Sequence, residues 1–83
     1  MKGVVFTEFM ELVESRMGLD MLDRIIGEAD LPNDGAYTSV GTYDHAELVR
    51  LVTALSNATG LTTSDLVLMF GEHLFTRFSV GYP

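Results

Sequence analysis

The C-terminal stretch Leu61–Pro83 carries the pattern that most limits how this chain can fold. It is the longest helical pattern of apolar residues in the sequence, and its apolar positions cover much more than one stripe. They form two groups, Val67, Phe70, Leu74 and Phe78 on one face, and Leu68, Phe75 and Val80 toward another. A helix that is apolar nearly all round must be covered on several sides. The alternatives for that cover are the preceding helices, a ligand, a further half of the domain, or a second copy of the chain.

The composition of the chain narrows the fold to one small domain without covalent staples. Its 83 residues are near the lower limit for burying an adequate core, so we expect a single helical domain over residues 1–83. Cysteine is absent, which excludes disulfides and the thiolate ligation of zinc, iron–sulfur clusters or heme iron. The hydrophobic fraction of 47% is high for so short a chain, and we expect part of it to meet a partner or a ligand.

The charge pattern excludes several classes of partner. The net charge is −7, and the five Lys and Arg residues are scattered singly, so neither nucleic acid nor an anionic membrane is expected. Apolar runs stay well below the ~20 residues that span a bilayer. Acidic residues follow a short apolar run at the N-terminus, unlike in a secretory leader. We therefore predict a cytoplasmic protein of bacterial type.

Residues 3–17 predict an amphipathic helix. Its apolar positions include Val5, Phe9, Leu12 and Val13, and its opposite face carries Glu8, Glu11 and Glu14, which we interpret as a solvated face. Gly18 is expected to end this helix. A second, shorter helix is predicted to begin with Asp20 as its N-cap and to stop at Leu31-Pro32.

The remainder of the chain predicts a loop and two further helices. The segment after the second helix has glycines and turn formers without a helical period, which indicates a surface connection in which Tyr37–Val40 pairs briefly as extended chain. Asp44 predicts the N-cap of the third helix, with Glu47 as its capping-box partner. Gly60 marks the end of the third helix, and Thr62 is the predicted N-cap of the fourth. The expected fold is an all-α, four-helix bundle.

No arrangement of residues predicts catalysis, so we expect neither an enzyme nor a catalytic or metal-ligating residue. His45 falls in the first turn of the third helix, where a surface position is expected. His73 lies between Phe70 and Phe78, where a satisfied or rim histidine is the favoured interpretation and metal ligation the alternative. The chain has no Glu-x-x-His, no G-x-G-x-x-G, no Walker motif and no serine in a glycine elbow.

Three segments of the sequence are informative together. They are Met1-Lys2-Gly3 at the start, the segment TGLTTSDLVLMFGEHLFTRF, and the closing Tyr82-Pro83. In this order and spacing they resemble the N-terminal half of the heme nitric oxide/oxygen-binding (H-NOX) domain. The most specific parts are the M-K-G start and the block Phe70-Gly71-Glu72-His73-Leu74-Phe75. The resemblance covers the whole chain but less than half of that domain.

The resemblance implies a heme cofactor and assigns four residues to its pocket. In that family these helices form the distal subdomain, which covers the heme face where gas binds. Val5 and Phe9 match positions that line the distal pocket, as do Leu74 and Phe78, and each pair shares a helix face by its i,i+4 spacing. All four are apolar, so this wall offers bound O₂ no hydrogen bond of the kind worth ~1–3 kcal/mol. The resemblance therefore favours NO as the ligand.

The resemblance also implies what lies outside this chain and what the domain does. The family's proximal histidine, its Tyr-x-Ser-x-Arg propionate clamp and its C-terminal sheet lie beyond the position that corresponds to Pro83. Its members relay the signal to a cyclase, a kinase or a diguanylate cyclase, which the acidic helix faces could help to dock. The alternative function is a heme-free helical interaction module that buries the fourth helix in a homodimer.

Overall fold

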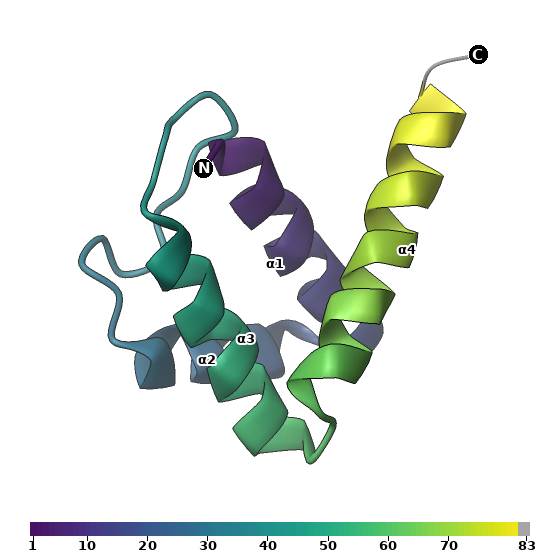
Figure 1. The fold of residues 1–83 in the computed structure, drawn as a ribbon. Helices are drawn as coiled ribbons and strands as arrows, with labels where there is room; N and C mark the ends of the chain where they lie inside the picture. Colours follow the sequence, from purple (N-terminus) through teal and green to yellow (C-terminus); the bar gives the residue numbers. More distant parts are fainter. Residues whose placement is uncertain (82–83) are drawn as a thin grey trace.

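The chain folds into four α-helices. The computed structural model describes residues 1–81, with side chains placed for residues 1–79. The helices are α1 (Gly3–Met17), α2 (Leu19–Ala29), α3 (His45–Thr59) and α4 (Thr63–Gly81), arranged as in Figure 1. Within residues 1–81 there is no strand, only an isolated bridge between Lys2 and Thr42. The predicted all-α fold is confirmed, whereas the side chain of Val80 and the Tyr82-Pro83 end lie outside the described residues.

The helix boundaries follow local signals, with two differences from the prediction. Gly18 joins α1 to α2 with φ +94°, a value that side chains disfavour. It is also the N-cap of α2, so the prediction that Asp20 caps this helix is wrong, and Asp20 lies in the first turn. Asp44 does cap α3, because its carboxylate accepts the Ala46 N–H at 3.0 Å. Glu47 does not complete a capping box, because its carboxylate accepts the phenolic O–H of Tyr37 at 2.7 Å instead.

The end of α3 and the start of α4 were both predicted from local sequence. Gly60 is the left-handed residue that ends α3, and the hydroxyl of Thr62 accepts the Asp65 N–H at 3.1 Å at the start of α4. The two helices therefore form a tight hairpin. Helix α2 contacts both α1 and α3, and α4 contacts α1 as well as α3.

One core unites the four helices. Its buried members are Phe6, Phe9, Leu12, Val13, Leu22, Ile25, Ala29, Leu31, Leu51, Ala54, Leu55, Leu66 and Phe70. These residues recur at helical spacing on each element, which is how the amphipathic pattern becomes a shared interior. From α4 the buried contribution within residues 63–79 is Leu66 and Phe70.

The connection between α2 and α3 packs on the N-terminal end of α1. Tyr37 stacks on Phe6 with ring centroids 4.4 Å apart, and Tyr43 meets the same ring edge-on at 5.5 Å. The predicted pairing of Tyr37–Val40 is wrong, because the only described bridge joins Lys2 to Thr42, next to a hydrogen bond from the Gly3 N–H to the Gly41 carbonyl. A Cβ atom on Gly3 would collide with the Thr38 carbonyl. The glycine of the M-K-G start therefore allows this close approach.

The helix α4 is covered on one side only. Val67, Leu68 and Phe75 are exposed, and the exposed fraction of Phe75 is 74%. The prediction that Val67 shares one face with Phe70 is therefore wrong, because Val67 is exposed and Phe70 is buried. Figure 1 shows α4 leaning away from the other helices toward its C-terminal end. The other three helices cover only part of this apolar helix.

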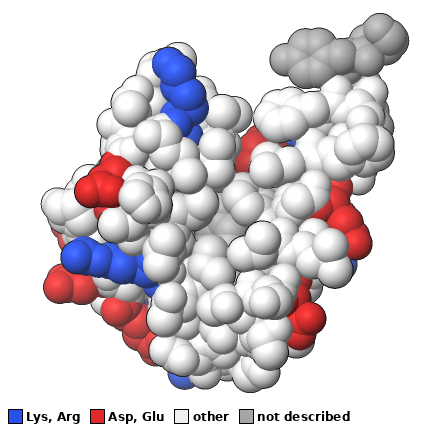
Figure 2. Space-filling model, in the orientation of Figure 1, with Lys and Arg blue, Asp and Glu red and all other residues white. Residues whose placement is uncertain are grey.

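On the face of the molecule shown in Figure 2, the charged side chains do not gather into a basic patch. In Figure 2 acidic side chains lie mainly toward the margins of the visible face, and its central part is free of charged residues. No helix within residues 1–81 is both long enough and apolar enough to cross a membrane.

Candidate functional site

Four apolar side chains on α1 and α4 form the first candidate site, here named the apolar wall. Val5 and Phe9 stand one helical turn apart on α1, and Leu74 and Phe78 one turn apart on α4. Phe9 is 1% exposed and meets the ring of Phe70 edge-on at 5.3 Å. Val5 and Leu74 are half-buried against the core, and Phe78 is 44% exposed. The wall therefore runs from the buried core to the surface.

The exposed end of the apolar wall lies where the two helices diverge. Val5 is near the N-terminal end of α1 and Phe78 is near the C-terminal end of α4. These two helix ends separate from each other in Figure 1, and an indentation lies between them in the space-filling view of Figure 2. The helices are joined deeper in the fold, at the level of Phe9 and Phe70. Apolar side chains on two diverging helices are suited to contact a flat apolar ligand.

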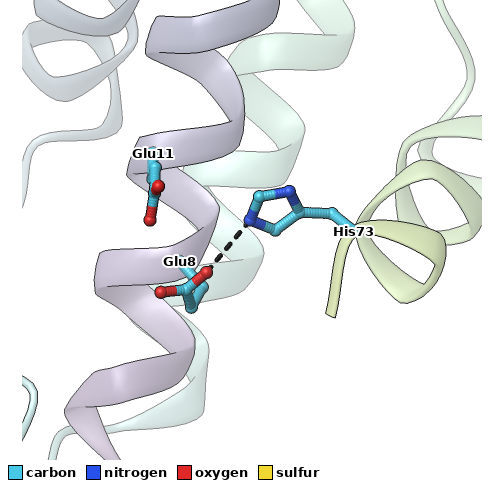
Figure 3. A group of neighbouring side chains, drawn as sticks. All are labelled: Glu8, Glu11 and His73. Atoms are coloured by element: carbon cyan, nitrogen blue, oxygen red, sulfur yellow. Dashed lines mark hydrogen bonds and ion pairs between the residues drawn. The ribbon is translucent and has the colours of Figure 1, made fainter. Parts of the chain in front are cut away.

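A polar cluster beside the apolar wall also joins α1 to α4, and we name it the polar bridge. It consists of Glu8 and Glu11 on α1 with His73 and Arg77 on α4. One oxygen of Glu8, Oε1, accepts from His73 Nε2 and from Arg77 Nε, each at 3.1 Å. Arg77 also reaches Glu11, with Nη2 3.7 Å from Oε2. Figure 3 shows His73 extending from α4 toward Glu8, with Glu11 above it on α1.

The burial of Glu8 corrects the prediction that it belongs to a solvated face. The residue is 9% exposed and is the one buried charged residue in the described part of the chain. A carboxylate tolerates burial when charged or polar donors replace water, and His73 and Arg77 do so here. No buried side-chain nitrogen or oxygen within residues 1–79 lacks a partner.

The polar bridge has a composition that also suits metal ions. Ligand atoms of Glu8, Glu11 and His73 lie within 4.8 Å of one another. The guanidinium of Arg77 contacts both carboxylates, however, and so already provides the positive charge that a cation would bring. The hydrogen bond between Glu8 and His73 Nε2 gives this histidine a partner, in line with the interpretation of a satisfied histidine. That the chain has no metal ligand stays a prediction.

Sequence reasoning missed the polar bridge although a signal for it was present. Glu8 and Glu11 are spaced i,i+3, and His73 and Arg77 are spaced i,i+4, so α1 carries a stripe of carboxylates and α4 a stripe of nitrogen-bearing side chains. Nothing local shows that the two stripes face each other, because Glu8 lies 65 and 69 positions from His73 and Arg77 in the sequence. His45, by contrast, lies on the surface as predicted, with its side chain 75% exposed.

Two tyrosines of the connection between α2 and α3, which pack on the N-terminal end of α1, have shifted pKa values. Burial and the hydrogen bond to the Glu47 carboxylate raise the pKa of Tyr37 well above its usual range. Donors from the side chain and backbone of Thr38 lower the pKa of Tyr43. These groups hold the loop that packs over Gly3, and through it the end of α1 that carries Val5.

The chain is similar to known proteins in both sequence and structure. The haem-NO-binding family model matches residues 2–83. Among solved structures, the Fe(II) unliganded H-NOX protein from K. algicida matches with 44% sequence identity and a TM-score of 0.94, and a single-residue mutant of it with 46% and 0.94. The H-NOX protein from Shewanella woodyi, bound to a compound in the Fe(II)CO ligation state, matches with 43% and 0.84.

The extent of these matches is asymmetric. Each covers 100% of this chain, but only 45% of the two K. algicida chains and 44% of the S. woodyi chain. The chain therefore spans less than half the length of the solved relatives that it matches. No curated protein matches it.

Proposed function

The chain belongs to the haem-NO-binding, or H-NOX, family, and from this premise we propose that it forms the distal side of a heme-dependent nitric oxide sensor. In this role it binds gas without catalysing a reaction, and it passes the signal to a cyclase, a kinase or a diguanylate cyclase in the cytoplasm. Val5, Phe9, Leu74 and Phe78 are the residues that would face the heme. The remaining side of the pocket would come from a segment that these 83 residues do not include.

The apolar wall is the observation that carries this proposal. Its four side chains lie on two helices that meet at Phe9 and open toward Phe78. The partial exposure of Phe78 leaves apolar surface for a porphyrin to cover, and burial of such surface is worth ~25 cal/mol per Å². The observation thus supports heme contact on residues of the chain itself.

The chemistry of the wall supports NO rather than O₂ as the ligand. None of the four wall side chains has a hydrogen-bond donor, and His73, the residue before Leu74, has its Nε2 paired with Glu8. Bound O₂ is polar and gains from a donor, whereas NO binds ferrous heme tightly without one. We expect the axial ligand to come from the other half of the domain, because His73 is held in the bridge.

Titration of the purified apo-protein with hemin tests this proposal. Because the axial ligand is expected from outside these 83 residues, imidazole is added with the hemin, and the expected result is a sharp Soret band that shifts on reduction and again on addition of NO. A broad spectrum like that of free heme, together with a dimer in size-exclusion chromatography, would contradict it. His73→Ala is the control for ligation, and the sharp band is expected to survive this change.

The exposed outer side of α4 favours a second candidate function. Val67, Leu68 and Phe75 are exposed apolar residues on the described part of this helix, and a homodimer would bury them without heme. In that case Leu68→Glu should convert a dimer into a monomer in size-exclusion chromatography coupled to light scattering. A parental chain that is monomeric at all concentrations would rule out this candidate.

A further inference from the structure

We propose that Glu8 is a positioning residue for the apolar wall. By holding His73 and Arg77 on one carboxylate oxygen, Glu8 fixes the rotation and the spacing of α4 relative to α1. It thereby sets the distance between the two sides of the wall. The inference rests on the proposed function, because it concerns how that same wall is held around a heme-bound gas.

The bridge residues and the wall residues are neighbours along both helices. His73 immediately precedes Leu74. Arg77 precedes Phe78 in the same way, and Glu8 precedes a wall residue on α1. Successive residues of an α-helix lie ~100° apart around its axis, with 3.6 residues in each turn. Any rotation of α4 that separates His73 from Glu8 therefore turns Leu74 and Phe78 by the same angle.

The bridge constrains orientation in a way that the neighbouring apolar contact does not. Phe9 meets Phe70 closer to the N-terminal end of α4 than the bridge does, and apolar burial is largely non-directional. Charge-assisted hydrogen bonds fix both distance and angle. In some systems, buried ionic groups add little to net stability and instead select one packing over its alternatives. Glu8 is thus expected to affect geometry more than stability.

The geometry of α1 and α4 can be measured in the whole chain without heme. Nitroxide labels at Glu14→Cys and Ser79→Cys sit on exposed positions of the two helices, and the chain has no other cysteine. Pulsed electron paramagnetic resonance then gives the distance distribution between them. Glu8→Met removes the acceptor at similar volume. Glu28→Met is the matched control, since Glu28 pairs with Arg24 at 3.0 Å on the exposed face of α2.

The expected result separates positioning from simple stabilisation. Glu8→Met should broaden the distance distribution and shift it to longer distances, Glu28→Met should leave it unchanged, and Glu8→Gln should restore most of the parental distribution because an acceptor oxygen remains. An unchanged distribution in Glu8→Met would overturn the proposal even if the melting temperature fell. If Glu8→Met does not fold, Arg77→Met removes one donor from a half-exposed position, and the absence of any shift there would overturn it as well.

A second readout uses the heme-loaded protein with CO as the probe. After reduction, the CO dissociation rate should rise in Glu8→Met, because a displaced wall encloses the ligand less, and should stay at the parental value in Glu28→Met. Failure of the parental chain to bind hemin would contradict the proposed function, while the label distances would still test the bridge. Hemin binding together with unchanged distances in Glu8→Met would overturn this inference alone.

Discussion

Truncation of three phenylalanines that differ in burial tests how the apolar wall is built. Phe9 on α1 is 1% exposed, Phe78 on α4 is 44% exposed, and Phe75 on the outer side of α4 is 74% exposed. The chemical change, phenylalanine to alanine, is the same at each position. Differences in the free energy of unfolding therefore report how much of each ring the fold buries.

The expected losses follow from these exposed fractions. Phe9→Ala should lower the free energy of unfolding by about 3–5 kcal/mol, the usual cost of emptying a buried aromatic site. Complete burial of a phenylalanine is worth ~1.5–3 kcal/mol, and Phe78 buries just over half of its surface, so Phe78→Ala should cost about 1–2 kcal/mol. Phe75→Ala should stay within about 0.5 kcal/mol of the parental protein, as exposed substitutions usually do.

Urea unfolding of the apo-protein, followed by far-ultraviolet circular dichroism, measures all three losses. Thermal melts provide a check, since 1 kcal/mol corresponds to a shift of about 4–8 °C in a domain of this size. Hemin affinity adds the functional comparison, because Phe78→Ala should weaken hemin binding and Phe75→Ala should not. A stability loss for Phe78→Ala as large as that for Phe9→Ala would refute the reasoning, since the Phe78 ring would then be core. Equal hemin affinity of the Phe78 and Phe75 variants would refute the assignment of Phe78 to the wall.

Further predictions concern the N-terminal end of α1, the loop over it and the start of α3. Gly3→Ala should destabilise the protein by about 1–3 kcal/mol, because a Cβ at this position meets the carbonyl of Thr38. Gly27→Ala should stabilise the protein by ~0.5–1 kcal/mol in thermal melts, because a Cβ there has no atom within 4 Å. Alkaline titration of tyrosinate absorbance should show Tyr43 ionising below and Tyr37 above the ordinary tyrosine pKa. Tyr37→Phe should remove the step assigned to Tyr37. Because the folded pKa of Tyr37 is raised, its stabilisation is complete below about pH 10 and is lost as the pH rises toward that folded pKa. Stability should therefore fall more steeply in this range in the parental protein than in Tyr37→Phe. Asp44→Ala should cost about 0.5–2 kcal/mol in urea unfolding through loss of the α3 cap.

The local structure of the chain was largely predictable from sequence. The first helix was expected over residues 3–17 and is observed as Gly3–Met17. Gly60 and Thr62 mark the turn between α3 and α4 as expected. These signals act within one or two helical turns, so a single sequence contains them. The error at Asp20 is of the same local kind, because Gly18, which was predicted only to end α1, is also the N-cap of α2.

The candidate site was predictable only in part. The apolar wall followed from the family resemblance, and the i,i+4 spacing within each helix agreed with it; its assignment to heme stays a prediction. The polar bridge was not found, because a glutamate on the polar side of an amphipathic helix has the same local pattern whether water or a second helix faces it. The same limit explains Glu47, whose partner Tyr37 comes from the preceding loop and not from the cap of its own helix.

Sequence by itself determined that this chain forms four helices, where most of them begin and end, and which family it resembles, because caps, glycines and apolar spacing act over short distances along the chain. Tertiary structure alone decided which face of the apolar C-terminal helix is covered and that Glu8 is buried against His73 and Arg77. Those outcomes depend on how α4 approaches α1, where Glu8 meets His73 and Arg77 across 65 and 69 residues of sequence. The approach is set by the shared core and by the exchange of water for protein donors around one carboxylate.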